Sequence, residues 1–149
     1  VLATRQGMAI RFPEEKVRAM GRSAYGGKGI ELDEGDYCIG MVAVKRDSTL
    51  LVVTENGYGK RTSIEDYRMT NRGGKGVINV KTTDRNGEVV AIMEVLDGDE
   101  LILITKGGIA IRSAVKDIHV IGRNTQGVRL MSLSENDRVT DVARVVAEE

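Results

Sequence analysis

Short runs of aliphatic and β-branched residues recur along the chain, separated by stretches rich in glycine and charge. Examples are Leu50–Val53, Val89–Met93, Leu101–Ile104 and Val142–Val146. Runs of four to six such residues between turn residues are typical of β-strands, because helices in globular proteins usually need at least about ten residues. The pattern therefore predicts an all-β protein built from short strands and tight turns.

One pattern occurs three times along the chain: Thr, two residues, Gly, three residues, Arg. The steps between copies are 50 and 51 residues, and a second Arg follows eleven residues after the first in each copy. A fixed period of this length is the signature of a repeated supersecondary unit. The repeated positions are Thr4, Thr54 and Thr105; Gly7, Gly57 and Gly108; Arg11, Arg61 and Arg112; and Arg22, Arg72 and Arg123.

Each unit reads as a strand, a glycine turn, a second strand that ends at the repeated Arg, a short connector, an Arg and Gly loop, and two more strands. The pair Asn56-Gly57 supports a tight hairpin, because glycine readily adopts the positive φ that such turns require. Four strands in about 50 residues match one propeller blade. The expected fold is a β-propeller with blades at 1–47, 48–97 and 98–149, and its open ends favour self-association.

Composition excludes most catalytic chemistry. The 149 residues include one His and one Cys, which cannot form an internal disulfide or a His/Cys zinc site. His119 is expected at the surface and Cys38 as a small buried residue, and no nucleophile with a base, paired carboxylates or phosphate-loop motif stands out. We expect no cofactor in this chain. No long apolar run or signal-peptide pattern occurs, so we expect a cytoplasmic protein without membrane contact.

The charges sum to zero, with 22 Lys and Arg against 22 Asp and Glu, yet the basic residues recur at equivalent positions. Symmetry would bring them to one edge of every blade, where they could follow the backbone of duplex DNA. In the plainer interpretation the glycines only form turns and the arginines only solubilise the rim. The candidate DNA-binding residues are Arg11, Arg22, Lys28, Lys60, Arg61, Arg72, Lys75, Arg112, Lys116 and Arg123.

Several segments carry a family resemblance. The segments 17–21 (VRAMG), 54–62 (TENGYGKRT), 71–87 (NRGGKGVINVKTTDRNG) and 121–128 (IGRNTQGV) closely resemble the C-terminal domain of the bacterial DNA gyrase A protein. The resemblance spans nearly the whole chain. It implies the last three blades of a six-bladed β-pinwheel, a propeller whose neighbouring blades exchange a strand. The family's box QRRGGKG has a related form here, NRGGKG, in the middle unit.

The resemblance also implies a function and partners. Such a domain is non-catalytic and wraps double-stranded DNA, so that ATP-dependent strand passage by the whole topoisomerase introduces negative supercoils. Its partners would be the remainder of the gyrase A protein and the gyrase B protein, in the bacterial cytoplasm at the nucleoid, with ATP and Mg²⁺ used by other domains. Two alternatives stay open: the equivalent C-terminal domain of topoisomerase IV, and a propeller that binds only proteins.

Overall fold

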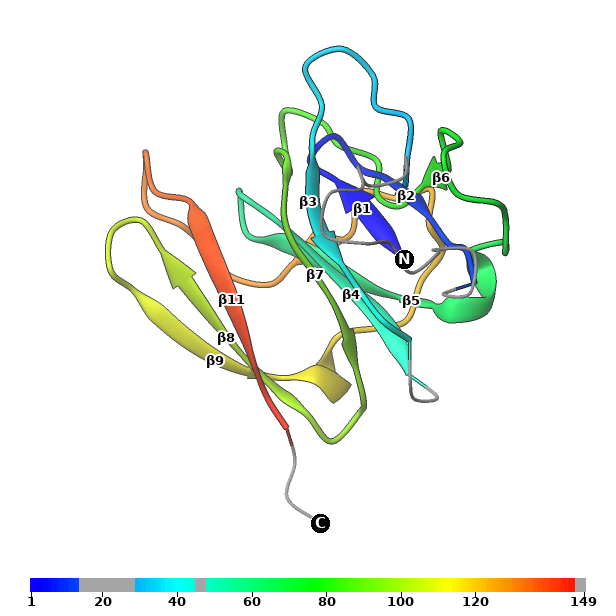
Figure 1. Ribbon diagram of the computed structural model, residues 1–149. Helices are drawn as coiled ribbons and strands as arrows, with labels where there is room; N and C mark the ends of the chain where they lie inside the picture. Colours follow the sequence, from blue (N-terminus) through cyan, green and yellow to red (C-terminus); the bar gives the residue numbers. More distant parts are fainter. Residues whose placement is uncertain (14–28, 45–47, 147–149) are drawn as a thin grey trace, which may run out of the picture.

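The fold is a row of small antiparallel sheets (Figure 1). The computed structural model describes residues 1–13, 29–44 and 48–146. Within these ranges the chain forms three sheets and two single-turn 3₁₀ helices, η2 (Ile64–Asp66) and η3 (Val115–Asp117), and no α-helix. The prediction of an all-β fold made of short strands is confirmed.

Every sheet combines strands that follow one another in sequence with one that returns from later in the chain. The first sheet has the order β3-β1-β2-β6, the second β10-β5-β4-β7 and the third β11-β8-β9. The strands of the first sheet are β1 (Leu2–Thr4), β2 (Met8–Ile10), β3 (Cys38–Met41) and β6 (Val77–Ile78); those of the second are β4 (Thr49–Thr54), β5 (Tyr58–Ser63), β7 (Val89–Val95) and β10 (Val128–Arg129); and those of the third are β8 (Glu100–Thr105), β9 (Ala110–Ala114) and β11 (Val139–Val145).

The sheets exchange strands along the row. β6 comes from the second sequence repeat but pairs with β2, and β10 comes from the third repeat but pairs with β5. Gly127 enters β10 with a φ of +81°, and a Cβ there would lie 2.7 Å from the Gly59 carbonyl oxygen of β5. Only glycine allows the donated strand to come this close. The third sheet has three strands among the described residues, one fewer than expected, whereas each of the first two sheets receives its fourth strand from the next repeat.

The donated strands lie at the outside of the row. β7 contacts both β3 and β11, so these three strands lie together on one side of the row, which we call the inner side (Figure 1). β6 and β10 occupy the opposite edges of their sheets. We call β6, β10 and the loops 71–76 and 121–127 that lead into them the outer edge.

Apolar side chains between neighbouring sheets hold the row together. Leu51 and Val53 of the second sheet pack with Leu101 and Leu103 of the third, and Val115 of η3 closes the same cluster. A second cluster joins Ala3 and Ala9 of the first sheet to Leu50, Ile64 and Tyr67. Each sheet therefore buries one face against the next, as stacked blades do.

Candidate nucleic-acid interface

The repeated arginines at the ends of β2 and β5 face the next unit, where their guanidinium groups bind main-chain carbonyls. Arg11 Nη1 donates to the carbonyl oxygens of Ile64 (3.1 Å) and Tyr67 (3.3 Å), and Arg61 Nη1 donates to those of Val115 (3.4 Å) and Ile118 (3.3 Å). These acceptors are equivalent positions around η2 and η3. The repeated Arg is therefore a clamp between consecutive units.

Arg61 illustrates how fully this clamp is enclosed. The residue is 5% exposed, and its guanidinium also contacts Thr49 Oγ1 (Nε, 2.9 Å) and Asp97 Oδ1 (Nη2, 2.5 Å). All three of its nitrogens thus donate within the protein. The prediction that Arg61 lies on an accessible basic rim is wrong, because packing of the third unit covers it. Arg11 is half-buried in the same arrangement.

Lys60 is also internal. Its side chain is enclosed, and Nζ donates to the carbonyl oxygens of Gly122 (2.8 Å) and Arg123 and to Thr125 Oγ1 (3.0 Å). Burial, and after it the neighbouring Arg123 charge, lowers the pKa of the Lys60 ammonium to about 8. Lys60 shapes the loop 121–127 from inside and is not available to an external phosphate, which corrects its predicted place on the rim.

The other candidate residues divide by exposure. Lys75, Arg112 and Lys116 are exposed and Arg72 is half-buried, whereas Arg22 and Lys28 lie outside the described residues. Arg112 occupies the repeat position of Arg61, but among the described residues no unit packs on it, and it forms an ion pair with Glu100. Half-buried Arg123 donates to the carbonyl oxygens of Asp66 (2.6 Å) and Ile78 (2.8 Å) and so ties the loop 121–127 to the second unit. Among the described candidates, those that reach solvent without an ion pair or a main-chain carbonyl partner are therefore Arg72, Lys75 and Lys116.

Three further basic residues lie at or beside the outer edge and do not follow the repeat. Lys81 comes shortly after β6, Arg129 is in β10, and Arg85 lies in the loop before β7; Lys81 and Arg85 are exposed, and so is Arg129. Sequence reasoning missed them because it weighed only basic residues that recur at equivalent positions. Gly127 indicates that a strand begins after it. Because side chains in a strand alternate between its two faces, this pattern was the sequence signal that could have identified Arg129.

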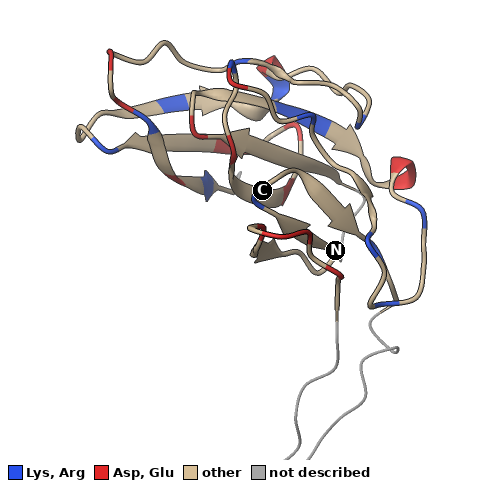
Figure 2. Cartoon of the chain, turned by 90° about the horizontal axis from the view of Figure 1, so that it is seen from above, with Lys and Arg blue, Asp and Glu red and all other residues tan. Residues whose placement is uncertain are grey.

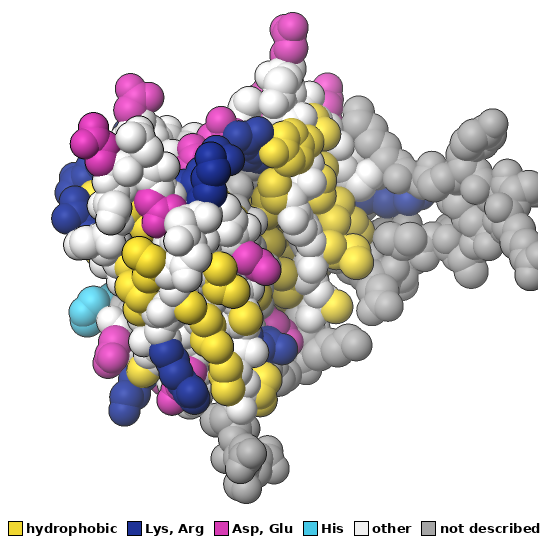
Figure 3. All heavy atoms as spheres, turned by 90° about the vertical axis from the view of Figure 1, so that its left-hand side faces the viewer, with side chains coloured by type: hydrophobic (Ala, Val, Ile, Leu, Met, Phe, Trp, Pro, Cys, Tyr) yellow, Lys and Arg dark blue, Asp and Glu magenta, His cyan; other side chains and the backbone are white. Residues whose placement is uncertain are grey.

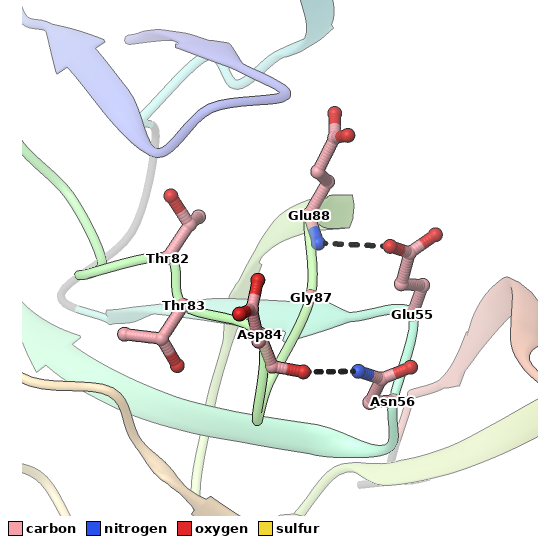
Figure 4. A pocket seen from close by; sticks show the side chains of 7 residues that line it. All are labelled: Glu55, Asn56, Thr82, Thr83, Asp84, Gly87 and Glu88. Atoms are coloured by element: carbon pink, nitrogen blue, oxygen red, sulfur yellow. Dashed lines mark hydrogen bonds between the residues drawn. The ribbon is translucent and has the colours of Figure 1, made fainter.

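Acidic residues interrupt this basic surface. Figure 2 shows Lys and Arg interspersed with Asp and Glu around the outline of the molecule. Beside the β4–β5 turn, Glu55, Asp84 and Glu88 line one hollow, in which the Glu88 backbone N–H donates to Glu55 Oε1 (3.2 Å) (Figure 4). Asn56 Nδ2 donates to the Asp84 carbonyl oxygen (3.2 Å) and fixes the same hollow. Three carboxylates make this hollow unsuitable for phosphate.

The described residues offer little other chemistry. They contain no group of three or more His, Cys, Asp or Glu side chains that could hold a metal ion. Among them, no helix is long and apolar enough to cross a membrane. His119 is exposed. Cys38, expected to be buried, is also exposed, because it opens β3 on the inner side of the row, away from the core clusters.

Stacked sheets that exchange a strand and carry basic residues at their outer edge define a repeat protein of the β-propeller class. The family model described as the DNA gyrase C-terminal domain, a β-propeller, matches residues 1–45, 48–95 and 99–145. The chain belongs to this family. The three matched segments follow the three sequence repeats.

Individual relatives agree with the family assignment. The DNA gyrase A protein of Staphylococcus aureus (strain MRSA252) is 47% identical over 147 residues, which cover 97% of this chain and 17% of the relative. A solved DNA gyrase A C-terminal domain superposes with a TM-score of 0.89 at 30% identity, over 97% of this chain and 50% of that one. The C-terminal domain of a DNA topoisomerase IV also gives 0.89, at 28% identity, over 97% and 45%. The chain thus spans about a sixth of the curated relative's length.

Proposed function

We propose that this chain is a DNA-binding part of a gyrase A protein and holds the backbone of duplex DNA along its outer edge. The observation that carries the proposal is the set of basic side chains from consecutive repeats on that edge. Arg72 and Lys75 precede β6, and Arg129 lies in β10. Among the described residues none of the three forms an ion pair with a carboxylate. Solvent-accessible cations without an ion-pair partner suit phosphate contacts that carry little base readout.

In the complete enzyme, the same contacts would wrap a DNA segment so that ATP-dependent strand passage introduces negative supercoils. The remaining parts of the gyrase A protein would supply cleavage and the gyrase B protein would supply ATP hydrolysis with Mg²⁺, in the bacterial cytoplasm at the nucleoid. Membership of the gyrase family supports this role. This chain would position DNA and would take no part in the chemistry.

Salt titration of DNA binding tests the proposal. A track that touches about six phosphates should give a log–log slope of affinity against salt near −5. The double variant Arg72→Ala/Lys75→Ala should weaken binding to all duplex sequences alike, measured by fluorescence anisotropy on several unrelated duplexes. Affinity that does not fall with salt would favour a protein-binding propeller, and a changed sequence preference in the variant would indicate base readout.

A second candidate is the equivalent domain of topoisomerase IV, favoured by the equal TM-score of that structural relative. Such a domain would hold DNA without strong wrapping. Both candidates predict salt-dependent binding. They differ in whether the bound chain changes the linking number of a plasmid that is relaxed in its presence, which only wrapping would do.

The open third sheet supports self-association through a second copy of the chain. Within the part of the chain that the structure describes, β9 pairs with β8 alone, and Thr105 N–H donates to the Ile109 carbonyl (2.9 Å). By the alternation of an antiparallel ladder, the N–H of Ala110 points to the open edge. Ile102 and Ile104 of β8 stay half-buried, and hydrophobic side chains form a stripe on this side of the molecule (Figure 3). An unpaired edge beside an apolar face is a template for an added strand.

Proline at position 110 should therefore weaken self-association. Ala110→Pro removes the outward N–H and leaves the β8–β9 hydrogen bonds intact, so the weight-average mass in sedimentation should fall toward that of the monomer. Ala110→Ser keeps the N–H and serves as the control. A wild-type chain that stays monomeric at every concentration would contradict self-association.

A further inference from the structure

Two arginines meet on one tyrosine beside β10. Tyr58, the first residue of β5, is 5% exposed, and its phenol oxygen accepts hydrogen bonds from Arg85 Nε (3.0 Å) and Arg129 Nη2 (3.2 Å). The guanidinium carbons lie 5.4 Å and 5.7 Å from the centre of the tyrosine ring, within cation–π distance. The hydrogen bond from Arg85, and after it that from Arg129, lowers the pKa of the Tyr58 phenol. The ring thus holds two exposed cations close together.

Strand exchange assembles this cluster. Arg129 lies directly opposite Tyr58 in the β10–β5 register and belongs to the third repeat, whereas Arg85 and Tyr58 belong to the second. The equivalent pair in the first sheet, Met8 opposite Ile78, is apolar. The cluster is therefore a feature of the junction between the second and third units and not of the repeat itself.

The two cations have no ion-pair partner in the described part of the chain: neither Arg85 nor Arg129 has a carboxylate within ion-pair distance there. Asp137 lines the same hollow, but its Oδ1 already accepts the backbone N–H groups of Gly107 (2.9 Å) and Arg138 (2.9 Å). Holding two guanidinium groups together without an acid costs electrostatic energy that a bound anion would relieve. Paired guanidinium donors match the oxygens of a phosphate group particularly well.

We propose that Arg85 and Arg129, positioned by Tyr58, form a phosphate-binding site at the outer edge. Under the proposed function, on which this site rests, its ligand is a backbone phosphate of duplex DNA. The site adds a fixed contact between the second and third units and gives DNA a defined position there.

The salt dependence of DNA binding measures the number of phosphates that the site holds. We expect Arg85→Gln/Arg129→Gln to make the log–log slope shallower by about two and to reduce affinity roughly tenfold or more at moderate salt. Arg85→Lys/Arg129→Lys keeps both charges and should keep most of the slope. The matched control is Arg138→Gln/Arg144→Gln, which removes one charge directly before the inner strand β11 and one within it. This variant should change the slope much less. An unchanged slope in the first variant overturns the proposal.

Chemical labelling of the wild-type chain gives a test that does not depend on the folding of a variant. Phenylglyoxal modifies accessible arginines, and mass spectrometry reports the rate at Arg85 and Arg129. Protection by duplex DNA alone assigns the site to backbone phosphate, whereas protection by inorganic phosphate as well assigns it to phosphate in general. Modification at an unchanged rate in the presence of bound DNA and of phosphate overturns the site. A chain that binds no DNA refutes the proposed function, and the inorganic phosphate experiment then judges the site separately.

Discussion

Arg61→Met is expected to lower the free energy of unfolding by about 3–4 kcal/mol. Methionine keeps most of the apolar stem but removes every donor. The carbonyls of Val115 and Ile118 would then lose their charged partner at the buried junction between the second and third units. A buried acceptor without a partner costs about 1–3 kcal/mol, and bonds to a charged donor are the strongest of their kind. Urea unfolding monitored by circular dichroism measures the loss.

The chain contains its own control at the same repeat position. Arg112 is exposed, and its only ion pair among the described residues is with Glu100 at the surface. Arg112→Met should therefore change the free energy of unfolding by no more than about 1 kcal/mol. Equal losses in the two variants would show that the repeated Arg stabilises its own unit and not the junction with the next one.

The sequence predicts the local structure of each unit well, because local structure depends on local residues. The period of 50 and 51 residues, the short aliphatic runs and the Asn56-Gly57 turn all correspond to elements of the fold. The sheet that each strand joins is harder to predict from the sequence. It depends on packing between units, and β6 and β10 are only two residues long.

The candidate interface shows the limit of repeat symmetry more sharply. Symmetry predicts one environment for Arg61 and Arg112, yet the first is buried and the second exposed. The reason is physical: equivalent residues share a backbone position, whereas burial depends on whether another unit packs on them. The cluster around Tyr58 was missed because it does not recur. The first sheet has the apolar residues Met8 and Ile78 at the equivalent positions, so a comparison of the repeats does not reveal the cluster.

The second large effect is expected at the glycine of the hairpin turn. Gly57 has a φ of +84°, and a Cβ there would lie 2.8 Å from the Met131 carbonyl oxygen, which follows the donated strand β10. Its own carbonyl accepts the N–H of Leu130 (2.7 Å). Gly57→Ala would therefore combine the strain of a positive φ with displacement of a neighbouring main chain. We expect a loss of about 3 kcal/mol in the free energy of unfolding.

Gly108 separates these two contributions. It occupies the same turn in the third unit with a φ of +87°, but a Cβ there would meet no atom within 4 Å. Gly108→Ala should cost only the strain of its backbone, about 1 kcal/mol. The difference between the two variants in urea unfolding thus measures how tightly the donated strand packs on the hairpin. If both variants lose the same amount, β10 tolerates movement, and the cluster of Arg129 with Tyr58 would not be held in a fixed position.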